Sequence, residues 1–164
     1  MKTIDASPLI EKLPPQIESL IANNQISDPL MIGIHTGGAW IAGRLHQALS
    51  LQEPLGSLDI SFYRDDFTRI GMNPQVKPSR LPSSVDDRHI ILVDDVLYTG
   101  RTIRAALNEI FDYGRPASVS LVVLVERSGR ELPIQADCTG QHMELGDEQH
   151  IKLQGPEPLS LILS

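Results

Sequence analysis

One stretch of the chain, Ile90–Thr102, limits the possible folds more than any other. It opens with four apolar residues, Ile90–Val93, a run long enough for a buried strand and too short for a helix. Two adjacent carboxylates, Asp94 and Asp95, follow at what we expect to be the carboxyl end of this strand. A short turn comes next, and a helical pattern of apolar residues begins at Ile103. The predicted order is therefore strand, acidic pair, turn and helix.

The turn has the chemistry of a phosphate site. A helix N-terminus offers free N–H groups and a partial positive charge, and Gly100 lets the backbone approach a ligand closely. Hydroxyl groups or a further charge come from Thr99, Arg101 and Thr102. Asp94 and Asp95 can bind vicinal hydroxyls or a hydrated Mg²⁺. We therefore predict a site for a sugar phosphate; the alternative is an ordinary turn in which one Asp caps the helix.

A second strand–loop–helix unit lies earlier in the chain. The apolar run Leu30–Ile34 predicts a buried strand, and the residues from Trp40 to about Leu49 predict a helix. Between them lies the glycine-rich loop Thr36–Gly38, whose N–H groups can bind a diphosphate. An ordinary turn is again the alternative, because two adjacent glycines are common in turns.

Strand and helix patterns alternate along the rest of the chain. Ser57–Tyr63, Ser118–Glu126 and Ile151–Leu153 have the patterns of strands. Helices are predicted from Pro15 to about Asn23 and from Ile103 to Tyr113, and Ser7 is the expected N-cap of a first short helix. This alternation predicts an α/β fold with a doubly wound, mostly parallel sheet. Ligands of such sheets bind at the carboxyl ends of the strands.

Composition excludes several classes of protein. The 164 residues suit one domain, and the formal net charge of −7 gives no general attraction for nucleic acid. The single cysteine, Cys138, excludes an internal disulfide and suits the cytoplasm, and we expect no membrane partner because no apolar run is long enough to span a bilayer. The histidines show no metal-ligand spacing, and a P-loop motif is absent.

The stretch Ile90–Thr102 resembles the signature with which type I phosphoribosyltransferases bind phosphoribosyl pyrophosphate (PRPP): an apolar run, Asp-Asp and Thr-Gly-x-Thr. The resemblance to the PyrR family, pyrimidine operon regulators and uracil phosphoribosyltransferases, extends to Tyr63–Asp66, Gly114–Pro116, Arg130–Ile134 and Ala136–Asp137. It implies the type I phosphoribosyltransferase fold with a small hood. Residues 1–164 would form a single domain, with 1–29 and 138–164 as flanking or hood segments.

The resemblance also implies a reaction, in which uracil and PRPP give UMP and pyrophosphate. Asp94 and Asp95 would be the catalytic residues, and Mg²⁺ would be carried by PRPP rather than bound directly by the protein. UMP and UTP are further expected ligands, and a homo-oligomer is the expected assembly. The implied substrate-binding residues are Thr36, Gly37, Gly38, Arg64, Asp65, Arg88, Val96, Leu97, Tyr98, Thr99, Gly100, Arg101 and Thr102.

Three segments depart from the family. Its pyrophosphate loop reads Thr-Arg-Gly, whereas this chain has Gly37 in the middle; in the place of its base hood, Thr139–Leu145 keeps only a glycine and an apolar residue. The family has a basic helix near the N-terminus, whereas the corresponding stretch of this chain is acidic and interrupted by prolines. We therefore expect weak or no RNA binding. A flap is expected over 68–87. Three hypotheses remain: a uracil phosphoribosyltransferase that also regulates pyrimidine genes, a nucleotide-binding regulator with a weak or lost reaction, and a transferase for another base.

Overall fold

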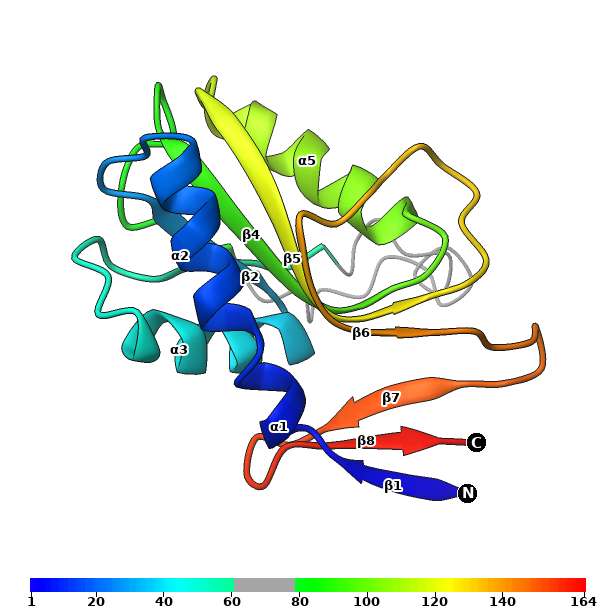
Figure 1. The fold of residues 1–164 in the computed structure, drawn as a ribbon. Coiled ribbons are helices and arrows are strands. Elements are labelled where there is room, and N and C mark those ends of the chain that lie inside the picture. Colours follow the sequence, from blue (N-terminus) through cyan, green and yellow to red (C-terminus); the bar gives the residue numbers. More distant parts are fainter. Residues whose placement is uncertain (61–78) are drawn as a thin grey trace.

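The structure, a computed structural model, describes residues 1–60 and 79–164, and its centre is a sheet of five parallel strands (Figure 1). Their spatial order is β3 (Gly56–Leu58), β2 (Leu30–Ile34), β4 (His89–Leu97), β5 (Ser118–Arg127) and β6 (Cys138–Met143). The strand that carries the acidic pair, β4, lies in the middle of this order. The predicted α/β fold with a mostly parallel sheet is confirmed.

Helices cover both faces of this sheet, which explains why its central strands are almost wholly apolar. The helices α1 (Ser7–Ile10), α2 (Leu13–Asn23) and α3 (Gly37–Ala48) cover one face, and α5 (Arg101–Tyr113) covers the other. Alternate residues of β4 point to opposite faces. Ile91 and Val93 are buried in the core that contains α3, whereas Ile90 and Leu92 are buried in the core that contains α5.

A second, three-stranded antiparallel sheet joins the two ends of the chain (Figure 1). Its order is β1 (Lys2–Asp5), β8 (Ser160–Leu163) and β7 (Ile151–Gln154). Leu153 and Leu161 anchor it in the core on the α3 side of the main sheet. The sequence predicted β7 but not β1, because β1 is short, mostly exposed and paired only with a strand from the far end of the chain.

The structure corrects two sequence-based expectations near the N-terminus. Ala6, not Ser7, is the N-cap of α1. The next helix, α2, begins at Leu13 rather than Pro15, because Pro14 and Pro15 fit the first turn, where backbone N–H groups have no partner within the helix. Within residues 1–60 and 79–164, every helix is too short or too polar to cross a membrane.

Two further expectations concern the edge strands of the main sheet. Residues 138–143, whose segment was expected to occupy the place of the base hood, form β6 of the main sheet, because they pair in parallel with β5. Of the strand predicted over Ser57–Tyr63, the described residues show β3, which ends at Leu58, and residues 61–63 lie outside the described part of the chain. Residues 61–78, which include most of the expected flap, lie outside the described residues.

Candidate functional site

The acidic pair lies where two neighbouring strands differ in length. Gly33 of β2 is paired with Val93 of β4, and β2 ends one residue later, whereas β4 continues along β5 to Leu97. Asp94 and Asp95 are therefore within β4 and not beyond its carboxyl end, which corrects the sequence-based expectation. Because β2 stops at this level, the edge of β4 facing β2 is left without a neighbouring strand beside the two carboxylates.

Backbone hydrogen bonds orient both carboxylates. Oδ1 of Asp94 accepts the N–H of Asp95 at 2.8 Å, and Oδ1 of Asp95 accepts the N–H of Val96 at 2.7 Å. Asp94 is 4% exposed. The N-cap of α5 is Gly100, so neither carboxylate has the simple role of a helix cap. The pair is positioned by its own strand and faces the end of β2.

The glycines of the loop that follows β2 form the first turn of α3, with Thr36 as N-cap. Both are packed against the acidic pair. A Cβ atom on Gly38 would lie 2.5 Å from the carbonyl oxygen of Val93, and a Cβ atom on Gly37 would lie 2.3 Å from Oδ2 of Asp95. Only residues without a side chain allow this helix N-terminus to approach the two carboxylates so closely.

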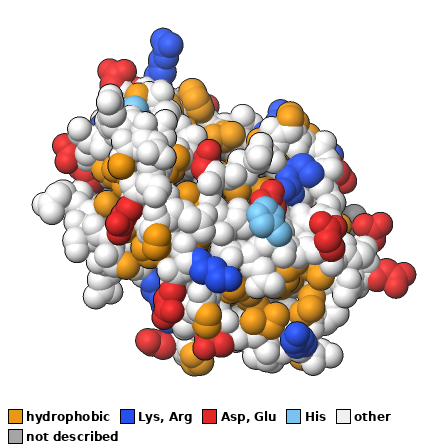
Figure 2. Space-filling model, in the orientation of Figure 1, with side chains coloured by type: hydrophobic (Ala, Val, Ile, Leu, Met, Phe, Trp, Pro, Cys, Tyr) orange, Lys and Arg blue, Asp and Glu red, His pale blue; other side chains and the backbone are white. Residues whose placement is uncertain are grey.

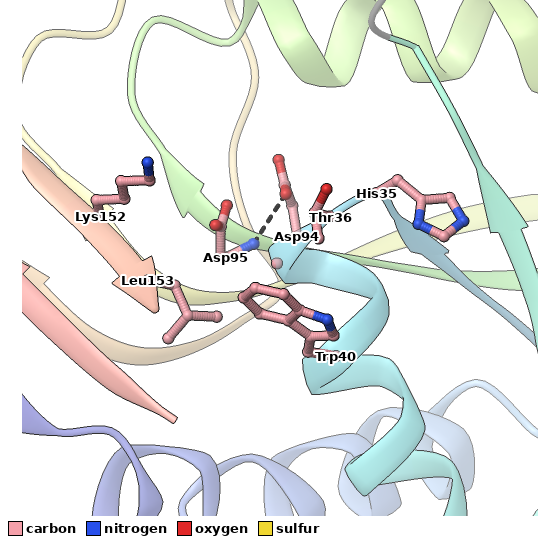
Figure 3. A pocket seen from close by; sticks show the side chains of 8 residues that line it. His35, Thr36, Trp40, Asp94, Asp95, Lys152 and Leu153 are labelled. Atoms are coloured by element: carbon pink, nitrogen blue, oxygen red, sulfur yellow. Dashed lines mark hydrogen bonds between the residues drawn. The ribbon is translucent and has the colours of Figure 1, made fainter. Parts of the chain in front are cut away.

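A cavity of about 490 Å³ opens between this helix N-terminus, the acidic pair and β7 (Figure 3). Its lining residues come from three segments that are far apart in the sequence: His35, Thr36, Gly37, Trp40, Asp94, Asp95, Lys152 and Leu153. The sequence-based site thus contributes Thr36, Gly37 and both aspartates, which the fold brings together. Gly38 lies behind them, against the backbone of β4.

The sequence did not indicate the roles of Trp40, Lys152 and Leu153, and it favoured a packed or surface position for His35. Lys152 stands between Ile151 and Leu153, which is the alternation of any half-exposed strand. No local sequence feature distinguishes Lys152, because its place in the lining of this cavity depends on how β7 packs against the rest of the fold. Figure 3 shows its ammonium group on the same side as the two carboxylates, with Trp40 and Leu153 below.

The second predicted turn, between β4 and α5, has a different structure. Gly100 adopts the left-handed conformation with φ of +98°. The carbonyl oxygen of Thr99 accepts the N–H groups of Glu131 and Leu132, at 3.0 and 3.1 Å, while the hydroxyl of Thr99 accepts the N–H of Arg101 at 3.2 Å. The turn is therefore fastened to the connection between β5 and β6.

Two arginines contact this turn, one at the end of β5 and one in the loop that follows it. Arg130 donates to the carbonyl oxygens of Tyr98 and Ile134 and forms an ion pair with Glu126 at 2.6 Å. The guanidinium of Arg127 lies 4.0 Å from the centre of the Tyr98 ring, a cation–π contact. The shape of the turn is therefore fixed by contacts with other parts of the protein.

Comparisons with known proteins agree with this geometry. The phosphoribosyl transferase domain family matches residues 2–153. The chain is 63% identical over 158 residues to the bifunctional protein PyrR of Nitrosococcus oceani, with 95% of this chain and 88% of that protein covered. It is 56% identical over 153 residues to that of Pseudomonas paraeruginosa, with 93% and 90% covered. The chain belongs to the PyrR family.

The fold of this PyrR-family chain is also found in solved structures of lower identity. A hypoxanthine-guanine phosphoribosyltransferase of Bacillus anthracis superposes with a TM-score of 0.69 at 17% identity, over 87% of this chain and 83% of that one. At this identity the likeness supports the fold and says nothing about the base. The type I phosphoribosyltransferase fold and the resemblance to PyrR are thus confirmed.

Not every predicted site residue of this PyrR-family chain reaches the cavity. Arg88 lies at the opposite end of β4, six residues before Asp94, which is ~20 Å along a strand. There it pairs with Glu53 at 3.1 Å and donates to the carbonyl oxygen of Asp28. Val96 and Leu97 belong to β4, and the side chain of Leu97 is in the core, so it can offer a ligand only its backbone. Arg64 and Asp65 lie outside the described residues.

The chemistry of the acidic pair fits a magnesium ion that arrives with a substrate. Within the described residues, no cluster of three or more His, Cys, Asp or Glu side chains could hold a metal ion. Mg²⁺ usually keeps several waters and binds through one or two carboxylates together with substrate phosphates. Asp94 and Asp95 meet that requirement, and a full set of protein ligands is not needed.

The only cysteine of the chain does not contribute a nucleophile. Cys138 is buried at the start of β6, and the pKa of its thiol is raised to about 11, mainly by burial and also by the charge of Asp137. The thiol therefore stays protonated near neutral pH, and a protonated thiol is a poor nucleophile.

Proposed function

We propose that this PyrR-family protein is a uracil phosphoribosyltransferase, which converts uracil and PRPP to UMP and pyrophosphate, and that it also senses nucleotides in the regulation of pyrimidine genes. One observation carries the proposal: an oriented acidic pair and a glycine-formed helix N-terminus, packed against each other, line a single cavity at the carboxyl edge of the sheet. A ligand with ribose hydroxyls next to a diphosphate needs these two groups in that relation.

The proposed mechanism follows from the charges of the reaction. As pyrophosphate leaves the anomeric carbon of PRPP, positive charge develops on the ribose ring and negative charge on the leaving group. Asp94 and Asp95 accept hydrogen bonds from the ribose hydroxyls and stabilise the positive ring. The N–H groups at the start of α3 face the departing pyrophosphate. Uracil N1 then bonds to the anomeric carbon and gives up its proton, without a covalent intermediate on the protein.

Each half of PRPP has its own turn in this proposal. The turn Thr36–Gly38 takes the pyrophosphate, and the turn Tyr98–Thr102 takes the 5-phosphate. Mg²⁺ would be carried to the site by PRPP, and Asp94 and Asp95 would lie beside it. Mg²⁺ supplies charge neutralisation of the leaving group when it is bound. Both turns lie at the carboxyl ends of neighbouring parallel strands, where ligands of doubly wound sheets bind.

We do not propose an RNA-binding surface on the N-terminal helices. Between Ser7 and Asn23 the charged residues are Glu11, Lys12 and Glu18, which leaves this segment acidic. On the face seen in Figure 2, Lys and Arg side chains are scattered singly among acidic ones. A phosphate backbone binds best to a continuous basic stripe. A band-shift experiment with pyrimidine leader RNA should therefore show weak or no binding, and a tight complex would contradict this expectation.

The closing test of the reaction is a turnover assay of the full chain with PRPP, Mg²⁺ and uracil, with UMP measured by chromatography. We expect UMP formation that depends on all three components. The double variant with Asp94→Asn and Asp95→Asn should lose PRPP binding, measured by calorimetry, and UMP formation together. Product with hypoxanthine or guanine and none with uracil would replace the proposed base. PRPP or UMP binding without any product would leave only the sensing role.

A further inference from the structure

The lining of the cavity has more negative than positive side chains, although the site is proposed to receive a negatively charged pyrophosphate. Two carboxylates, Asp94 and Asp95, line it. Among the described residues that line it, Lys152 is the one with a permanent positive charge. A pyrophosphate so close to two carboxylates is repelled unless cations lie next to it. Lys152 is therefore the side chain of this cavity whose charge opposes that of the carboxylates.

The turn that faces the pyrophosphate cannot supply such a cation itself. At position 37 a Cβ atom would lie 2.3 Å from Oδ2 and 2.9 Å from Cγ of Asp95. The carboxylate of Asp95 is fastened by the N–H of Val96, so the space that a side chain of residue 37 would enter is occupied. In this chain the turn offers backbone N–H groups, and a positive side chain has to come from another element.

Lys152 comes from such an element. It lies on β7, an edge strand of the small sheet made by the two chain ends, and that sheet is anchored in the core by Leu153 and Leu161. The neighbouring Leu153 lines the same cavity, so the backbone at this point is fixed beside it. Lys152 is exposed and forms no ion pair with another described residue. Figure 3 shows its side chain extending on the side of the two carboxylates.

We propose that Lys152 binds the pyrophosphate group of PRPP and of the product, in place of the side-chain cation that the turn at Gly37 cannot carry. This assignment rests on the proposed transferase function and names a residue of its site. An ammonium group is a compact charge that suits phosphate oxygens approached from one side. The small sheet then has a function beyond joining the chain ends: it completes the site.

The role is electrostatic, and the reaction balances without a proton from Lys152. The bond between the anomeric carbon and the pyrophosphate oxygen breaks, and its electron pair leaves with the pyrophosphate. The new bond forms from uracil N1, whose proton goes to solvent. Lys152 stabilises the negative charge that accumulates on the leaving group.

The experiment compares three ligands that differ in the group concerned: PRPP with Mg²⁺, pyrophosphate with Mg²⁺, and UMP, which lacks pyrophosphate. Calorimetry is done on the full chain and on the variants Lys152→Gln and Lys152→Arg. Lys2→Gln is the matched control, because it removes the same charge from the same sheet, on the far edge strand β1. We expect Lys152→Gln to weaken PRPP and pyrophosphate binding about tenfold, the change that one charge-assisted contact supports. UMP binding should change less than twofold, Lys152→Arg should recover most of the affinity, and Lys2→Gln should match the native chain.

The outcomes separate this assignment from the proposed function. If the native chain binds PRPP and Lys152→Gln binds it equally well, Lys152 has no such role and the transferase proposal is untouched. If Lys152→Gln weakens UMP as much as pyrophosphate, the lysine acts on the whole site and the assignment is wrong. If the native chain binds neither PRPP nor pyrophosphate, both proposals fail. Thermal unfolding of each variant checks that its fold is intact.

Discussion

Two turns, Thr36–Gly38 and Tyr98–Gly100, lie at the same edge of the sheet. They share the same order of sequence features, but different contacts hold them in place. Each joins a parallel strand to the N-terminus of a helix, and the two strands are neighbours. The first turn is held by close packing, because its glycines lie against the backbone of β4 and against the carboxylates of that strand. The second is fastened from outside, by the backbone of Glu131 and Leu132 and by the side chain of Arg130.

This difference predicts that the two turns respond to opposite kinds of substitution. A substitution that adds atoms should destabilise the closely packed first turn, and one that deletes a contacting side chain should destabilise the second. It also separates the ligand groups, since the first turn is proposed for pyrophosphate and the second for the 5-phosphate. Variants of each turn can therefore test the two ideas with the same binding measurements.

The largest effect is expected for Gly38→Ala. The added Cβ would lie 2.5 Å from the carbonyl oxygen of Val93 and 2.9 Å from Cα of Asp94. Both atoms are backbone of the central strand, so neither can move aside cheaply. We expect the free energy of unfolding to fall by about 2–3 kcal/mol, as for overpacked cores. PRPP binding by calorimetry should be lost over the accessible range.

Gly43→Ala is the control for that variant, because it makes the same change later in the same helix. A Cβ atom on Gly43 would meet nothing within 4 Å. Alanine is the better helix former, so this variant should gain up to about 1 kcal/mol of unfolding free energy in denaturant titration. PRPP binding should be unchanged. Equal damage from both substitutions would show that the close packing at Gly38 is irrelevant.

Arg130→Ala should have the next largest effect, now by removal. It deletes the hydrogen bonds to the carbonyl oxygens of Tyr98 and Ile134 and leaves Glu126 without its 2.6 Å partner. We expect a loss of about 2 kcal/mol in unfolding free energy, the value for hydrogen bonds that involve charged groups.

Binding measurements on Arg130→Ala sharpen the comparison between the two turns. UMP should bind about tenfold more weakly, because its phosphate uses the second turn, whereas pyrophosphate binding should be retained. Arg115→Ala, at an exposed arginine beyond the end of α5, is the matched control. Loss of pyrophosphate binding with retention of UMP would reverse the assignment of the two turns.

Gly100→Ala adds an atom to the second turn and should cost less than the same change at Gly38. Its φ of +98° disfavours a side chain, and the nearest atoms are side-chain carbons of Ile134 and Leu132 at 3.1 to 3.3 Å, which can give way. We expect a loss of about 1–2 kcal/mol from the left-handed backbone alone. A melting temperature lower for Gly100→Ala than for Gly38→Ala would contradict the contrast between the turns.

Glu131→Ala should have the smallest effect. The carboxylate pairs with Arg101 at 3.1 Å, but both side chains are more than half exposed, and such pairs contribute at most about 1 kcal/mol. The backbone N–H of Glu131, which fastens Thr99, remains in the variant. Denaturant titration should therefore place it within about 1 kcal/mol of the native chain. A loss as large as that of Arg130→Ala would mean that the exposed pair stabilises the turn.

The sequence identified both turns because each is a local pattern: an apolar run, polar or glycine residues and a helix follow one another within a few residues. Parallel strands then bring the two turns to one edge without further information. The length difference between β2 and β4 was not visible, so the acidic pair was expected after the strand rather than within it. Arg88 was expected at the site, and the fold places it at the other end of β4.

By itself, the sequence determined the fold class, the family, the acidic pair and the two turns. Each of these follows from residues close together in the chain, such as apolar runs and the glycines next to them. Only the tertiary structure decided that β1 pairs with β8, that Gly37 leaves no space beside Asp95, and that Lys152 lines the cavity. These facts join residues more than fifty positions apart. Such contacts depend on how whole strands pack, and a local pattern does not encode that packing.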